Sequence, residues 1–268
     1  MKKEKKLDVV FILDKSGSMG GQEENTISSF NEYLEKEKKN KYETNITTVL
    51  FSDTYNVIHD RVPVSKVKKL TNKEYYVGGC TALYDALGNT IHSMESKDTD
   101  KVLFIIITDG YENASREYHI DDIKKLIKKN KDYEFIYIGA DIDSYGAGSS
   151  IGIKKDNIAN FKKDRKGTAT LFNAVGCFEK CMMEDSMSGS WKQELDEYLQ
   201  ENEKWFSFFY CLYGKFSVFL SFSFNILIWD IAILFNFSSP IDCLTLSLIN
   251  TEFKFSRFAK HINSFIDA

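Results

Sequence analysis

Five residues with oxygen-bearing side chains are spaced so that they could bind a metal ion: Asp14, Ser16, Ser18, Thr81 and Asp109. The first three alternate along the segment DKSGSMGG, and in an extended turn this period-two spacing points their side chains the same way. Hydroxyl and carboxylate oxygens without His or Cys suit a hard divalent ion, Mg²⁺ or Mn²⁺, rather than zinc. The residue types therefore predict a magnesium or manganese site.

The charge of this set indicates what the ion would do. If the three hydroxyls bind the ion directly and the two carboxylates hold it partly through water, the coordinating groups are nearly neutral and the ion stays electrophilic. Such an ion takes an anionic sixth ligand, and a carboxylate from another protein would serve. The expected function is therefore protein binding without catalysis.

These residues need a scaffold that brings them together, and apolar runs of strand length supply it. Buried parallel strands are predicted for LDVVFIL (7–13), KVLFIIIT (101–108) and EFIYIG (134–139), with the second of these in the centre of the sheet. The runs at 44–51 and 55–64 lie a few residues apart in the sequence and predict an antiparallel hairpin.

Segments of helical period alternate with these strands. Helices are expected around 27–34, from Thr81, at 120–130, at 144–151 and, as a long helix, from Thr168. This alternation predicts an α/β fold with a doubly wound, mostly parallel central sheet, one antiparallel edge strand and helices on both faces. Ligands of such sheets bind outside the carboxyl ends of the strands, where the loop after 7–13 and the turn after 101–108 stand.

The motifs closely resemble those of the von Willebrand factor type A (vWA) family, whose metal-ion-dependent adhesion site (MIDAS) has a D-x-S-x-S loop, a separate Thr and a separate Asp. DKSGSM matches the loop, GGCTALYDAL matches the segment at Thr81, and TDGYEN matches the turn at Asp109. The resemblance covers about residues 7–184, and in style it is similar to intracellular bacterial and phage members. It implies a Mg²⁺-dependent protein-binding module, often found beside AAA+ ATPases, that is not an enzyme.

A phosphatase and a dinucleotide-binding protein each match fewer residues of this sequence than a metal-dependent binding module does. A phosphatase of the haloacid-dehalogenase type would use Asp14 as nucleophile, but the second carboxylate that it wants two residues later is Ser16 here. The glycines at 144–152 do not follow the pattern of a dinucleotide-binding loop. The motif residues could also be helix caps and turn formers, and Glu112 and Asn113 could support the site or form a polar turn.

Charge and cysteine content limit the partners and the compartment. The 268 residues carry a net charge of −4, so the sequence indicates no basic surface for nucleic acid. Five cysteines at no framework spacing, with no export signal, suggest reduced thiols in the cytoplasm. Cys177 and Cys181 lie one helical turn apart but lack further ligands nearby, so core packing is expected rather than metal binding.

The chain is expected to have three parts: composition marks the boundary at 204, and the vWA resemblance, with a helix break expected at DSMSGS (185–190), marks the one at 184. The vWA domain is expected at 1–184, a linker and amphipathic helix at 185–204, and a Phe-rich apolar tail at 205–268, which contains 13 of the 21 Phe residues. The amphipathic helix could pack on the domain, which we favour, or form a stalk. The tail contains none of the residues assigned to function.

One segment of the tail, 216–237, has the length and hydropathy of a membrane span. Asp230 near its middle and Asn225 would be costly in lipid. Three interpretations stay open: an anchor to the cytoplasmic face of the membrane, a sticky or partly buried extension, and a sequence read out of frame from A/T-rich codons.

Overall fold

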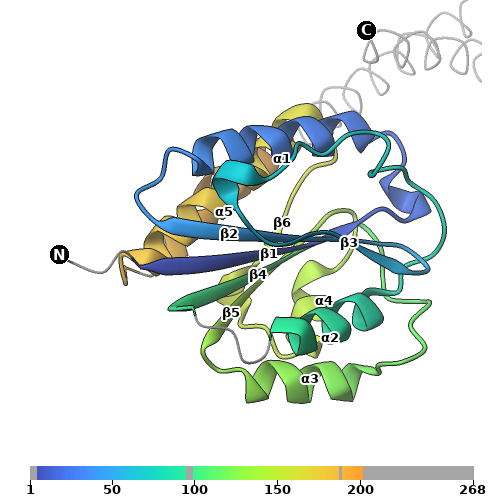
Figure 1. Cartoon of the computed structure of the whole chain (residues 1–268). Coiled ribbons are helices and arrows are strands. Elements are labelled where there is room, and N and C mark those ends of the chain that lie inside the picture. The colour runs from blue at the N-terminus through green and yellow to red at the C-terminus, as the bar shows by residue number, and fades with distance from the viewer. Residues whose placement is uncertain (1–4, 95–98, 187–188, 202–268) are drawn as a thin grey trace, which may run out of the picture. The chain divides into compact units, whose positions relative to one another are not determined.

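Strands and helices alternate along residues 5–94, 99–186 and 189–201, the part of the chain that the computed structural model describes (Figure 1). The strands are β1 (Lys6–Asp14), β2 (Glu43–Phe51), β3 (Tyr55–Pro63), β4 (Lys101–Thr108), β5 (Tyr133–Gly139) and β6 (Ile158–Asn160). The helices are α1 (Glu23–Glu37), α2 (Leu83–Met94), α3 (Ile120–Lys129), α4 (Ser144–Ser150) and α5 (Arg165–Met183).

The strands form one six-stranded sheet in the order β3-β2-β1-β4-β5-β6. β1 pairs in parallel with both β2 and β4, and parallel pairing continues through β5 to β6. β3 pairs antiparallel with β2, because a short turn joins the two strands. The predicted fold class is confirmed: a mostly parallel sheet with a hairpin whose outer strand is an antiparallel edge.

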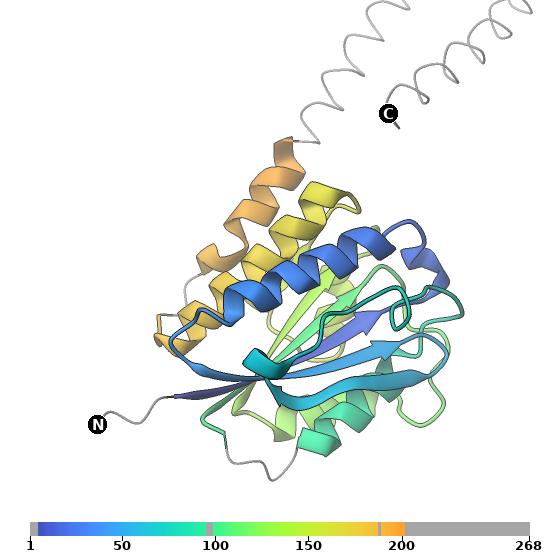
Figure 2. The ribbon, with the colours of Figure 1, turned by 45° about the horizontal axis from the view of Figure 1, so that its top comes forward.

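Helices cover both faces of the sheet, and this explains why the central strands are apolar along their whole length. α1 and α5 lie side by side on one face, while α2, α3 and α4 cover the other (Figure 1), and Figure 2 shows the α1 and α5 layer from above. On the first face Phe11 packs against Phe30 and Phe172, with ring centroids 5.2 and 6.1 Å apart. On the second face Phe104 stacks on Phe135 with centroids 4.9 Å apart.

Two local details differ from the sequence prediction. α5 begins at Arg165 rather than at Thr168, because the carboxylate of Asp164 accepts a hydrogen bond of 2.7 Å from the backbone N–H of Gly167 and caps the helix earlier. The strand β6 was not predicted, since three residues are too few to show a strand pattern.

The expectation that Cys177 and Cys181 pack in the core is wrong. Both are free cysteines, Cys177 is exposed and Cys181 is partly exposed. The core face of α5 carries Leu171, Val175 and Phe178 at helical spacing, so the two cysteines fall outside it.

Residues 189–201 pack on the domain, beside α5 (Figure 2). Trp191 meets Phe178 edge-on, with ring centroids 5.3 Å apart, and its Nε1–H donates to the carbonyl oxygen of Asp156 at 2.9 Å. Leu195 is 1% exposed in the same core. The segment therefore packs rather than projects as a stalk, whereas the domain boundaries at 184 and 204 stay predictions.

The Phe-rich tail at 205–268, including the segment 216–237, lies outside the described residues. No helix in the described part of the chain combines the length and the apolar character that a membrane crossing requires.

A buried polar contact joins α1 to α5. The hydroxyl of Tyr33 donates to Oε1 of Glu179 at 2.7 Å, and both side chains are buried, as is Glu37. Burial, followed by the charge of Glu37, raises the pKa of Glu179 well above its ordinary value. The fold therefore favours the protonated carboxyl at this position.

Candidate metal centre

The loop after β1 brings the first three predicted site residues together. Asp14 ends the strand, and its Oδ1 accepts a hydrogen bond of 2.6 Å from the backbone N–H of Ser16. The Oγ atoms of Ser16 and Ser18 lie 3.1 Å apart. A backbone hydrogen bond of 3.0 Å from Gly17 to Gly79 fixes this loop against the segment that leads to Thr81.

The turn after β4 meets the same loop. β1 and β4 are parallel neighbours, so their carboxyl ends lie at one edge of the sheet. The hydroxyl of Ser18 donates to Oδ1 of Asp109 at 2.5 Å, and the hydroxyl of Thr108 donates to Oδ2 of Asp14 at 2.6 Å. Two motif segments 91 residues apart are thereby in direct contact.

Thr81 lies against this turn as well. A Cβ atom added to Gly110 would stand 2.9 Å from Oγ1 of Thr81 and 3.4 Å from Oγ of Ser18. The two hydroxyls therefore border one small space beside Gly110. All five predicted residues lie at the same edge of the sheet, and glycine at position 110 keeps the space between two of them open.

Glu112 and Asn113 form the polar turn that supports the Thr81 segment. Oδ1 of Asn113 accepts a hydrogen bond of 2.8 Å from the backbone N–H of Thr81, and the N–H of Asn113 donates to the Thr81 carbonyl oxygen at 3.0 Å. Oε2 of Glu112 accepts from the backbone N–H of Tyr84 at 2.9 Å, in the first turn of α2. The interpretation as a polar turn is thus confirmed, and support of a bound metal ion by these two residues stays a prediction.

Two buried carboxylates make this edge favourable for a cation. Asp14 and Asp109 are 1% and 5% exposed. Burial raises the pKa of Asp14, and the nearby charge of Asp109 adds to the rise. Hydrogen bonds from Thr108 and Ser16 lower the pKa, but it stays above its ordinary value. A divalent ion would relieve the repulsion between the two carboxylates.

The chemistry of the donors fits a hard divalent ion. Mg²⁺ or Mn²⁺ would be held by three hydroxyls and two carboxylates, those of Asp14, Ser16, Ser18, Thr81 and Asp109. Among the described residues no three His, Cys, Asp or Glu side chains gather into a metal-binding group. Three of the five predicted donors are hydroxyls, those of Ser16, Ser18 and Thr81.

A cation that the sequence did not predict stands beside Asp109. Lys163, from the loop between β6 and α5, donates to Oδ2 of Asp109 at 3.0 Å and lies 2.9 Å from Oδ2 of Asp141. Burial opposes the charged form, but the hydrogen bonds to the two carboxylates outweigh it and raise the pKa of Lys163. No motif marks this lysine, and only the order of the strands could have placed it here.

The sequence matches the family described as von Willebrand factor type A domain over residues 8–173, which is more than half of the chain and includes all five site residues. The chain belongs to the von Willebrand factor type A family. No curated protein matches the sequence significantly.

Solved structures share the vWA fold at low sequence identity. The PilB minor pilin from Streptococcus sanguinis has a TM-score of 0.53 at 12% identity, covering 70% of this chain and 63% of the pilin. The vWF domain of the type V pili tip protein Mfa5 from Porphyromonas gingivalis also has a TM-score of 0.53 at 12% identity, covering 67% and 97% of the two chains.

Proximal thread matrix protein 1 from the mussel byssus has a TM-score of 0.46 at 18% identity, covering 68% of this chain. The chain spans only 45% of the length of that protein. A further structure of the mussel protein has a zinc-occupied MIDAS motif. At 12% identity the likeness to the two pilus proteins shows the fold alone.

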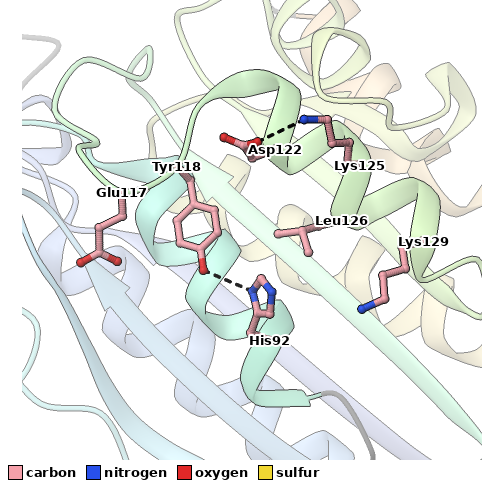
Figure 3. Close-up of a pocket in the computed structure, with 7 residues that line it drawn as sticks. All are labelled: His92, Glu117, Tyr118, Asp122, Lys125, Leu126 and Lys129. Carbon is pink, nitrogen blue, oxygen red and sulfur yellow. Dashed lines mark hydrogen bonds and ion pairs between the residues drawn. The ribbon is translucent and has the colours of Figure 1, made fainter.

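A pocket between α2 and α3 of the vWA domain is lined by charged and aromatic side chains (Figure 3). The hydroxyl of Tyr118 lies 3.2 Å from Nδ1 of His92, and Nζ of Lys125 lies 3.4 Å from Oδ1 of Asp122. These polar groups pair with one another rather than converge on a common point. The pocket therefore shows no set of donors comparable to the MIDAS residues.

Proposed function

We propose that the protein is a divalent-metal-dependent adhesion or scaffold module whose MIDAS accepts a carboxylate from a protein partner. Mg²⁺ or Mn²⁺, when bound, supplies a Lewis-acidic position for an anionic oxygen. The contact of 2.5 Å between Ser18 and Asp109 is the observation that supports the proposal most, because it joins the D-x-S-x-S loop to the separate Asp.

We infer binding rather than catalysis at this site. Both carboxylate oxygens of Asp14 accept hydrogen bonds inside the protein, from the N–H of Ser16 and the hydroxyl of Thr108, and so they hold the loop. A nucleophile of the haloacid-dehalogenase type would also need a carboxylate at position 16, where a serine stands.

The proposed partner is a protein that presents an acidic side chain. The family resemblance makes an AAA+ ATPase one candidate, and the net charge of −4 argues against nucleic acid. We propose a cytoplasmic location. The hydropathy of 216–237 supports attachment to the membrane as an addition to that proposal.

Asp14→Ala tests the metal site. The variant should lose Mg²⁺ and Mn²⁺ binding in isothermal titration calorimetry while its circular dichroism spectrum stays that of the wild type. Asp121→Ala is the matched control, because this aspartate of α3 has a side chain that is 77% exposed and lies 3.8 Å from Nζ of Lys124. Unchanged metal affinity in D14A would refute the site assignment.

A separate assay distinguishes the module from an enzyme. The protein should hydrolyse no generic phosphate ester in the presence of Mg²⁺. Turnover that is measurable in the wild type and lost in Asp14→Asn would instead favour the phosphatase.

A further inference from the structure

We propose that Lys163 is a built-in competitor of the metal ion: its ammonium group lowers the affinity of the MIDAS for the ion and leaves the loaded site more attractive to an anionic ligand. This role rests on the proposed function, because it requires that the MIDAS residues bind the ion. It concerns a side chain outside the five motif positions.

The position of the ammonium group is the first support. The side chain of Asp109 is fully buried, and its two oxygens have different partners: Oδ1 accepts from Ser18 at 2.5 Å and Oδ2 accepts from Lys163 at 3.0 Å. A positive charge therefore touches a predicted metal-holding carboxylate directly. Because that carboxylate is buried, salt in the solvent screens the interaction less than it screens a surface ion pair.

The lysine is also held in place from several sides. Its carbonyl oxygen accepts a hydrogen bond of 3.1 Å from Nε2 of Gln22, which stands just before α1. The next residue, Asp164, caps α5, and Nζ of Lys163 bridges to Asp141 at 2.9 Å. Only 25% of the Lys163 side chain is exposed. The charge is thus a fixed part of the site.

Counting charges shows the consequence. Asp14 and Asp109 give the site two negative charges, and Lys163 reduces this to one. A divalent ion then leaves a net charge of plus one, whereas without the lysine the loaded site would be neutral. The side chain of Asp141 is 67% exposed, so water weakens its contribution. Lys163 therefore opposes entry of the cation and favours a carboxylate as the next ligand.

The test is a titration of the full chain with Mn²⁺, followed by the loss of the free-ion signal in electron paramagnetic resonance. Lys163→Met should bind Mn²⁺ about threefold to tenfold more tightly than the wild type, the range expected for removal of one partly exposed positive charge near a dication. Lys163→Arg keeps the charge and should stay within about twofold of the wild type.

Lys162→Met is the matched control. It removes the same charge one residue earlier, where Nζ lies 3.2 Å from Asp164 and the side chain is 44% exposed. Its Mn²⁺ affinity should stay within about twofold of the wild type. Lys163→Gln repeats the test if Lys163→Met does not fold by circular dichroism.

The outcomes separate the two proposals. Wild-type binding with unchanged affinity in K163M overturns the competitor role alone. Weaker binding in K163M also overturns it and would make Lys163 a residue that orients Asp109. Failure of both the wild type and K163M to bind Mn²⁺ overturns the proposed function and, with it, the role of Lys163.

Discussion

Replacing Gly110 by Ala tests whether the hydroxyls of Thr81 and Ser18 belong to one metal site. The added Cβ would stand 2.9 Å from Oγ1 of Thr81 and 3.4 Å from Oγ of Ser18. Ordinary van der Waals contact begins at 3.4 Å, so the Thr81 hydroxyl must move by about 0.5 Å while Ser18 can stay. The substitution thus displaces one predicted ligand by a known amount.

We expect the affinity for Mn²⁺ to fall about tenfold to a hundredfold, the range found when groups that position metal ligands are altered. Tenfold corresponds to about 1.4 kcal/mol of binding free energy. The free energy of unfolding should change by less than about 1 kcal/mol, because the φ angle of Gly110 lies outside the left-handed region and alanine also restricts the unfolded chain.

Calorimetric titration with Mn²⁺ and urea denaturation measure the two quantities on the same protein. Gly176→Ala is the control, since an added Cβ in this part of α5 would meet nothing within 4 Å. Its Mn²⁺ affinity should equal that of the wild type. If G110A binds Mn²⁺ as tightly as G176A does, the Thr81 hydroxyl is not a metal ligand.

Three further predictions concern stability and the tail. In urea denaturation G176A should be more stable than the wild type by about 0.5–1 kcal/mol, whereas Gly167→Ala should be less stable, because its Cβ would lie 2.2 Å from a backbone carbonyl oxygen; the opposite order would contradict the described start of α5. Glu179 has a higher pKa in the folded protein than its ordinary value of 4.5. Its protonated form therefore contributes fully to the free energy of unfolding below pH 4.5, and this contribution is lost as the pH rises through the folded-state pKa. Wild type should therefore lose stability relative to Glu179→Gln on going from about pH 4 to pH 8, and parallel pH profiles would contradict the described burial. A chain ending at Lys204 should be soluble, monomeric in analytical ultracentrifugation and able to bind Mg²⁺; aggregation would mean that the tail belongs to the domain.

The fold could be predicted because its central strands are long and almost wholly apolar. Strands that are buried on both faces need apolar residues at nearly every position, and LDVVFIL and KVLFIIIT show this pattern. The helices between them have apolar residues at clear helical spacing. β6 has only three residues and carries no such signal. Asp164 indicates the early start of α5, because Asp is a favoured helix cap. The helical spacing of apolar residues instead favours a start at Thr168.

The site was predictable only where it follows a motif. The five oxygen donors stand at recognisable spacings, so their sequence context places them at one edge of the sheet. Lys163 and Gly110 lie at the same edge because the order of the strands brings Lys163 to Asp109 and Gly110 to Thr81 and Ser18. Cys177 shows the opposite error, since its residue type favoured burial while its position on α5 faces outward.

The turn after β4 and the first turn of α2 exchange hydrogen bonds in both directions. Glu112 accepts a hydrogen bond from the N–H of Tyr84. The carboxylate of Asp85 accepts hydrogen bonds of 2.8 to 2.9 Å from the N–H groups of residues 116–118. Grafting only the five donor residues onto another parallel sheet would therefore leave Thr81 on a loop without a fixed position. The smallest transplantable unit includes Asn113, which holds the backbone of Thr81, and Asp85 and Glu112, together with the helix and the turn that they join.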